Sequence, residues 1–284
     1  MNFKLFGRPL GLTALSVLSQ MLGMPVLSHL LLALSVLALL YACWQAKNVV
    51  ADDVLHNPDT GYAAWIAATI SEYSLILSGP LQTWLWFASL LLASLFVAIW
   101  LVRLAEGTGL STFDPSTVAW PIPWTVCDLT APAAMKPASH LFGVIGAVLS
   151  AGVLLVAVLR IRKREILNSM RSIWYGVGGC AVLVLWVSKA GLSPPMTDGL
   201  IAFFSLMGVA WLMCVFVVGF STHGAWSNLF SLCSVAKAML ALGATAPAQA
   251  VFAIALATLV VDLRTSTWPM LVPLSRRLCQ LKRK

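Results

Sequence analysis

Three ionisable side chains lie deep inside apolar stretches of this sequence, namely Glu72, Asp128 and Lys237. A charge within a hydrocarbon layer costs about 2.5–3.5 kcal/mol on insertion scales, so such groups usually pair with one another or serve an ion or solute path. Because acids and a base occur together, we predict that Lys237 lies within reach of Glu72 or Asp128. A buried structural cluster with no further role is the competing interpretation.

Neutral polar residues accompany these charges at helical spacing. Side chains three, four or seven residues apart share one face of an α-helix. Grouped by apolar stretch, the residues predicted to line a polar path are Thr13, Ser16 and Gln20; Thr69 and Glu72; Thr125 and Asp128; and Ser234 and Lys237, which share a helix face with Phe230. Ser and Thr at this spacing also serve as hydrogen-bond partners between helices, so a purely structural role stays open.

The elements that carry these residues are long and apolar. Apolar residues make up 60% of the 284 residues and charged residues 10%, whereas a soluble domain carries roughly a quarter charged residues. The apolar runs have about the 17–25 residues that cross roughly 30 Å of hydrocarbon. We predict an all-α membrane protein with spans at 9–25, 28–46, 61–78, 82–102, 117–135, 140–159, 173–189, 197–221, 225–243 and 247–266. Residues 1–284 then form one polytopic domain with a basic C-terminal tail at 272–284.

The basic residues support ten spans. With the N-terminus in the cytoplasm and a change of side at each span, 15 of the 18 basic residues are cytoplasmic, as the positive-inside rule requires. They are Lys4, Arg8, Lys47, Arg103, Arg160, Arg162, Lys163, Arg164, Arg171, Arg264, Arg276, Arg277, Lys282, Arg283 and Lys284. We therefore predict a multi-pass protein of the inner (plasma) membrane with both termini cytoplasmic. Only Lys136 and Lys189 lie outside.

The polar residues divide the spans into two kinds. Ionisable and hydroxyl side chains fall in the middles of odd-numbered spans, while even-numbered spans are mostly Leu, Val, Ala, Phe and Trp. This pattern predicts an inner ring of odd helices around a conduit and an outer layer facing lipid. Within the fifth span, Pro121, Pro123 and Pro132 break the helix, which is tolerated only inside a bundle or against a water-filled cavity.

The sequence lacks the residue patterns that several other function classes require. The net charge of +8 resides at span ends, which argues against nucleic acid as a partner. The six cysteines show no CxxC pair, so we expect no metal site, and the histidines sit at span ends or in loops, away from haem-ligating positions. GxGxxG, Walker A, HExxH and GxSxG motifs are absent. We therefore expect no cofactor and no catalytic residues, and the chain is not expected to be an enzyme.

Three short motifs resemble those of a known family of membrane proteins. Leu55-His56-Asn57-Pro58, followed by Tyr62-Ala63-Ala64-Trp65, resembles a His-Pro turn that leads into the family's third helix. The Trp/Pro entry to the fifth helix is resembled by Trp120-Pro121-Ile122-Pro123-Trp124-Thr125-Val126. The Trp-x-x-x-Phe opening of the ninth helix is resembled by Gly224-Ala225-Trp226-Ser227-Asn228-Leu229-Phe230-Ser231. With ten spans and inner odd helices, the sequence resembles the tellurite-resistance/dicarboxylate transporter family. Its relatives include slow-type anion channels and malate and sulfite permeases.

This resemblance implies a fold and a function. It implies five helical hairpins around a central pore, no cofactor, and a homotrimer in the lipid bilayer. It also implies a channel or transporter for small anions of the dicarboxylate, sulfite or oxyanion type, with Phe230 as the gate that plugs the pore. Two acids on inner helices oppose an anion path, so Glu72 and Asp128 must be protonated or neutralised by Lys237.

Other function classes remain open from the sequence. The chain fits the membrane anchor subunit of a redox complex, which would need a quinone site and a soluble redox partner. It also fits a structural subunit of a secretion or conjugation complex. A membrane acyltransferase would need a catalytic histidine at a membrane face, where His56 and His140 are the candidates.

Overall fold

A computed structural model describes residues 3–47, 64–106, 121–132, 135–162, 177–178, 180–188, 191–216 and 225–262. All regular secondary structure in these ranges is helical, which confirms the all-α prediction for the described part of the chain. The motif around His56, the loop at 163–171 and the basic tail at 272–284 lie outside these ranges. The helices are η1 (Phe3–Phe6), α1 (Gly7–Met21), α2 (Pro25–Ala46), α4 (Ala64–Ile76), α5 (Pro80–Ala105), α6 (Pro121–Leu129), α7 (Lys136–Arg162), α9 (Pro194–Phe216), α10 (Ala225–Ala241) and α11 (Thr245–Asp262).

Each of the ten predicted spans contains a helical segment in the structure. The seventh corresponds to helical residues 177–178 and 180–187. Of the fifth, predicted at 117–135, the structure describes 121–132 and 135, where α6 covers nine residues and ends at Leu129. Residues 117–120 lie outside the described ranges, and Pro121 and Pro123 lie in the first described turn of α6. The helix ends before Pro132, whose ring prevents it from continuing.

Glycine turns join several consecutive helices. After α1, the Gly23 N–H donates to the Gln20 carbonyl at 3.1 Å, and φ of Gly23 is +77°. After α10, the Gly243 N–H donates to the Leu240 carbonyl at 3.0 Å, with φ +83°. This left-handed conformation at a helix C-terminus is nearly free of strain only for glycine. Gly79 and Gly191 have positive φ at two further helix junctions, and α2, α5 and α9 all begin with proline.

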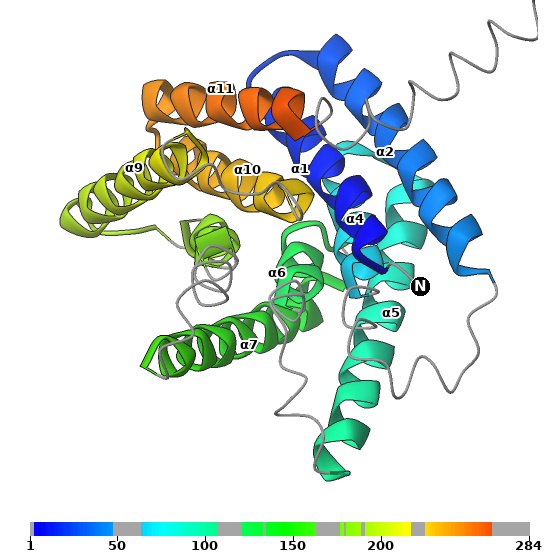
Figure 1. The fold of residues 1–284 in the computed structure, drawn as a ribbon. Helices are drawn as coiled ribbons and strands as arrows, with labels where there is room; N and C mark the ends of the chain where they lie inside the picture. Colours follow the sequence, from blue (N-terminus) through cyan, green and yellow to red (C-terminus); the bar gives the residue numbers. More distant parts are fainter. Residues whose placement is uncertain are drawn as a thin grey trace, which may run out of the picture.

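The helices occupy two layers. In Figure 1, α1, α4, α6 and α10 lie toward the middle, and α2, α5, α7, α9 and α11 lie around them. The middle helices contact each other, since α1 packs against α4 and α10, and α4 packs against α6. Twelve of the 15 residues of α1 are buried, whereas α2 buries only four of its 22. The burial of the described helices agrees with the predicted inner and outer layers.

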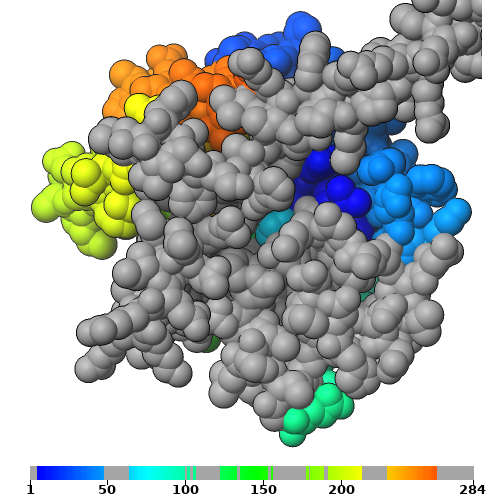
Figure 2. Space-filling model, viewed as in Figure 1, coloured from blue at the N-terminus to red at the C-terminus, as the bar shows by residue number. Residues whose placement is uncertain are grey.

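The outer helices present apolar side chains on the surface. Leu37 on α2, Trp84 and Leu91 on α5, and Leu206 on α9 are more than half exposed. Figure 2 shows α2, α9 and α11 at the periphery of one face of the molecule. Within the described residues, Pro25–Ala46, Pro80–Ile99 and Pro194–Leu212 are long and apolar enough to cross a membrane. Exposed apolar surfaces of this kind mark regions of a protein that contact a membrane or another protein.

Candidate functional site

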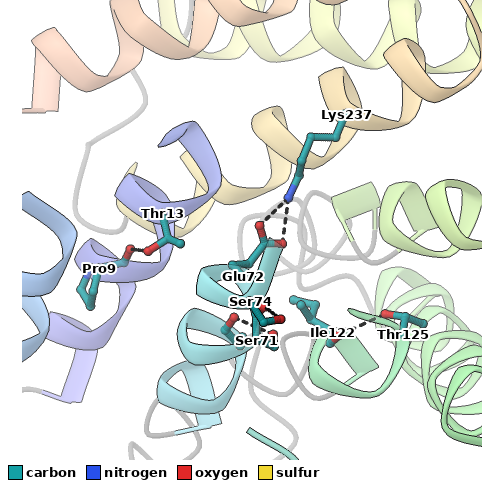
Figure 3. Close-up of polar contacts among 9 residues, drawn as sticks. Pro9, Thr13, Ser71, Glu72, Ser74, Ile122, Thr125 and Lys237 are labelled. Atoms are coloured by element: carbon teal, nitrogen blue, oxygen red, sulfur yellow. Dashed lines mark hydrogen bonds and ion pairs between the residues drawn. The ribbon is translucent and has the colours of Figure 1, made fainter. Parts of the chain in front are cut away.

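A buried ion pair joins two of the inner helices. The Nζ atom of Lys237 on α10 lies 2.8 Å from Oε1 and 2.7 Å from Oε2 of Glu72 on α4. The two side chains are 1% and 0% exposed. Figure 3 shows them pointing toward one another across the space between α4 and α10. The prediction that Lys237 lies within reach of Glu72 or Asp128 is therefore confirmed for Glu72.

Both members of the ion pair lie near the C-terminal ends of inner helices. Glu72 and Lys237 each lie four residues before the last residue of their helix, Ile76 and Ala241. Backbone groups in the middle of a helix are already hydrogen-bonded, so a buried charge must find a side-chain partner. The ammonium of Lys237 donates to both carboxylate oxygens, and the two formal charges cancel within the apolar core.

Phe230 and Ser234 complete this site along α10. The Lys237 Nζ lies 5.7 Å from the centroid of the Phe230 ring, two helical turns earlier, within cation–π range. The end of the lysine side chain therefore lies on the Phe230 side of α10. Both Phe230 and Ser234 are buried, and the Ser234 Oγ has no hydrogen-bond partner among the described residues. The buried Ser231 Oγ of the same helix likewise has no hydrogen-bond partner among the described residues.

Asp128 belongs to a different cluster. Its Oδ1 accepts a hydrogen bond from the Ser139 Oγ at 2.6 Å, and its Oδ2 accepts one from the Trp186 indole N–H. The Nδ1 of His140, an exposed side chain, lies 3.3 Å from the same Oδ2. These contacts connect the end of α6 to the start of α7 and to residues 180–188. Of the two acids proposed as partners of Lys237, only Glu72 occupies that position.

Thr13 and Ser16 lie between α1 and α2. The Thr13 Oγ1 donates to the Pro9 carbonyl at 2.7 Å and is 2.5 Å from the Ser35 Oγ of α2. The Ser16 Oγ donates to the Ser28 carbonyl of α2 at 2.6 Å. Gln20, predicted on the same face, is exposed near the end of α1. The structure therefore uses the two hydroxyls to join α1 to α2, and the role of all three in a solute path stays a prediction.

Thr69 and Thr125 are buried on the inner helices α4 and α6. The Thr69 hydroxyl donates to the Trp65 carbonyl at 2.8 Å, and the Thr125 hydroxyl donates to the Ile122 carbonyl at 3.0 Å. Figure 3 includes the contact of Thr125 with Ile122. Because each hydroxyl is hydrogen-bonded to a carbonyl of its own helix, these contacts do not test whether Thr69 and Thr125 line a solute path. Of the predicted residues, the structure thus gathers Glu72, Phe230, Ser234 and Lys237 into one site.

A polar bridge between three helices was not predicted. The Ser35 Oγ on α2 donates to the Pro9 carbonyl of α1 at 2.7 Å and lies 2.9 Å from the Tyr73 hydroxyl of α4. The signal was present in the sequence, because Ser28 and Ser35 are seven residues apart and share a face. They are also among the four buried residues of α2. Sequence analysis missed them because the span was classed as an outer one.

Comparisons with known proteins add no relative to this description. No family model, curated protein or solved structure matches the chain. Among the described residues, no group of three or more His, Cys, Asp or Glu side chains is arranged to hold a metal ion.

Proposed function

We propose that this chain is an integral membrane channel or transporter for small anions. Ten spans, arranged as five helical hairpins, would surround a central path lined by the odd-numbered spans, in the manner of the tellurite-resistance/dicarboxylate transporter family that the sequence resembles. The apolar surface of α2, α5 and α9 supports a lipid environment. The inner membrane, the cytoplasmic termini and a homotrimeric assembly are parts of the same proposal.

The observation that carries the proposal is the buried site formed by Lys237, Glu72, Phe230 and Ser234. Lys237 is the only lysine or arginine among the fully buried side chains of the described residues, and it is held on an inner helix. An ammonium in a dry environment attracts an anion far more strongly than one in water. Glu72 neutralises it in the structure, so the charge can be kept in the core until a solute replaces the carboxylate.

Phe230 is the proposed gate of this path. It precedes Lys237 by seven residues, which is about 10 Å along the helix. An aromatic ring at a constriction blocks passage sterically and by excluding water. The cation–π contact between the Lys237 ammonium and the Phe230 ring would couple the position of the gate to the state of the ion pair.

Anion flux into liposomes tests the proposal directly. The full-length purified chain is reconstituted, and uptake of chloride, nitrate, sulfite and malate is measured against protein-free vesicles. We expect uptake of at least one anion, and we expect the double variant Glu72→Gln/Lys237→Met, which removes both charges, to lose most of it. Lys136→Met is the matched control, because Lys136 is an exposed lysine on α7. Equal uptake in the double variant and the wild type would refute a role for Lys237.

A further inference from the structure

An exposed apolar stripe runs along one face of the outer helix α2. Its members are three or four residues apart and are each between 44% and 84% exposed, namely Val26, Leu30, Leu34, Leu37, Tyr41 and Trp44. Trp44 follows Leu34 by ten residues, which is about 15 Å along the helix and about half of the hydrocarbon layer. The second half of the stripe therefore has the length of the acyl chains in one leaflet.

The stripe ends in a cluster of two aromatic rings, an amide and a lysine. The ring centroids of Tyr41 and Trp44 are 6.2 Å apart, and the Lys47 Nζ lies 5.1 Å from the centroid of the Trp44 ring. This cation–π contact holds the ammonium beside the ring and leaves N–H donors for an acceptor. The Gln45 Nε2 donates to the Tyr41 hydroxyl at 3.1 Å, so the phenolic hydrogen is also left for an acceptor. The cluster therefore offers a charged and a neutral donor where the apolar stripe ends.

The charges at this end of the α1–α2 hairpin are positive. Residues 3–47 contain no Asp or Glu, and Lys4 and Arg8 lie at the start of the hairpin. Helix η1 contacts both α1 and α2, and Figure 1 shows the start of α1 and the last turns of α2 at the same end of the hairpin. The ion pairs among the described residues involve Glu72 and Asp128 and not Lys47. The charge of this end of the hairpin therefore complements an anion.

We infer that the last turns of α2 bind an anionic phospholipid, with its phosphate at Lys47 and Tyr41 and an acyl chain along Leu37 and Leu34. This inference rests on the membrane setting of the proposed function and not on anion transport. The phosphate oxygens accept hydrogen bonds from the ammonium and the hydroxyl. A headgroup such as glycerol leaves the phosphate charge uncancelled, whereas choline brings its own cation toward a basic surface. The proposed topology places this end at the cytoplasmic leaflet, where anionic lipids attract basic residues.

Trp84 on α5 provides the contrast within the same molecule. It is 74% exposed, more than Trp44, and among the described residues no cation lies over its ring. Gln82, beside it in sequence, donates to the Ser74 carbonyl instead of to an aromatic hydroxyl. Trp84 thus has the features of a general anchor at the membrane interface. The cluster at the end of α2 adds a fixed charge and a hydroxyl donor, which are what a phosphate recognises.

Lipid titration tests the inference. The full chain, purified in detergent, is titrated with phosphatidylglycerol or with phosphatidylcholine that carries the same oleoyl chains, and native mass spectrometry counts the bound lipid. We expect several-fold tighter binding of phosphatidylglycerol and a smaller preference at higher ionic strength. Equal binding of the two lipids would overturn the inference and leave the proposed function intact. A chain that fails to float with vesicles of either lipid on a density gradient would instead reject the membrane setting and the proposed function with it.

Substitutions at exposed positions identify the groups that bind the headgroup. Lys47→Gln should weaken phosphatidylglycerol binding roughly five-fold and leave phosphatidylcholine binding unchanged. Tyr41→Phe removes the hydroxyl and Trp44→Leu removes the ring beside the ammonium, so both should reduce the preference. Lys136→Gln and Trp84→Leu are the matched controls and should keep it. An unchanged preference in Lys47→Gln would overturn the inference. Dissociation of an oligomer in Trp44→Leu would also reject it, because the stripe would then be covered by a second copy of the chain.

Discussion

At the residue scale, the Glu72–Lys237 pair determines how the inner helices hold together. Removing one partner leaves the other charge buried and unpaired, which costs about 3–5 kcal/mol. We expect Lys237→Met to lower the yield of folded protein in detergent sharply, because Glu72 then faces an apolar side chain at full burial. In Glu72→Gln/Lys237→Met neither charge remains, so the yield should be partly restored. Monodisperse yield by gel filtration measures both, and a double variant no better than Lys237→Met would contradict a stabilising pair.

Phe230 offers a second prediction at this scale, with two distinct outcomes. As the gate, its replacement in Phe230→Ala widens the path, so anion flux per folded molecule should rise while the fold persists. As an ordinary core residue, only 3% exposed, its loss would open a cavity, cost about 3–5 kcal/mol and lower activity with yield. Flux normalised to folded protein distinguishes the two, with Phe204→Ala, another fully buried phenylalanine on α9, as the control. Unchanged or lower unitary flux in folded Phe230→Ala protein would reject the gate.

At the element scale, the turns after α1 and α10 need glycine, because their backbone adopts a positive φ that other residues rarely adopt. Gly243 has φ +83° with nothing near its missing Cβ, so Gly243→Ala introduces backbone strain without a clash. An L-residue in this region costs roughly 1–2 kcal/mol. Gly199, in α9, also has open space but no positive φ, so Gly199→Ala should be neutral or slightly stabilising. Thermal unfolding in detergent should rank the variants in this order, and an equal loss in both would contradict the turn argument.

The helices could be predicted from the sequence, because the length and apolarity of each stretch indicate a helix. The contacts between the helices could not be predicted in the same way. Spacing places Thr13 and Ser16 on one face of α1, but periodicity does not say which neighbour that face meets. The structure directs them to Ser35 and Ser28 of α2. For Lys237 the cost of an unpaired buried charge reduced the expected partners to Glu72 and Asp128, and the structure shows that Glu72 is the partner. Asp128 differed because it lies at a helix end, where Ser139 and Trp186 are available.

At the scale of the whole molecule, the two layers of helices and the buried Glu72–Lys237 pair together support a membrane setting. The outer helix α2 buries four of its 22 residues and exposes leucine and tryptophan, while the inner helices α1 and α4 bury 12 of 15 and nine of 13 residues. In water this arrangement would leave a large apolar surface exposed. In a bilayer the same surface is solvated by lipid, and the polar groups of α1, α4 and α10 are sequestered from it. Among the described residues, a few paired polar and charged side chains therefore lie within an apolar core, and the outer helices expose apolar side chains.

Orientation in the bilayer is the remaining prediction at this scale. Helix α7 has 27 residues, Lys136–Arg162, and at 1.5 Å per residue it spans about 40 Å, more than the roughly 30 Å of hydrocarbon. Its two ends must then lie on opposite sides of the membrane if it crosses. Because basic residues concentrate after this helix and in both terminal segments, those segments should be cytoplasmic. A single cysteine at Lys136 should react with an impermeant maleimide from outside intact cells, and cysteines at Glu106 and Arg164 only after permeabilisation. The unmodified chain gives the baseline from its native cysteines, and labelling of Lys136→Cys and Arg164→Cys from the same side would disprove the ten-span topology.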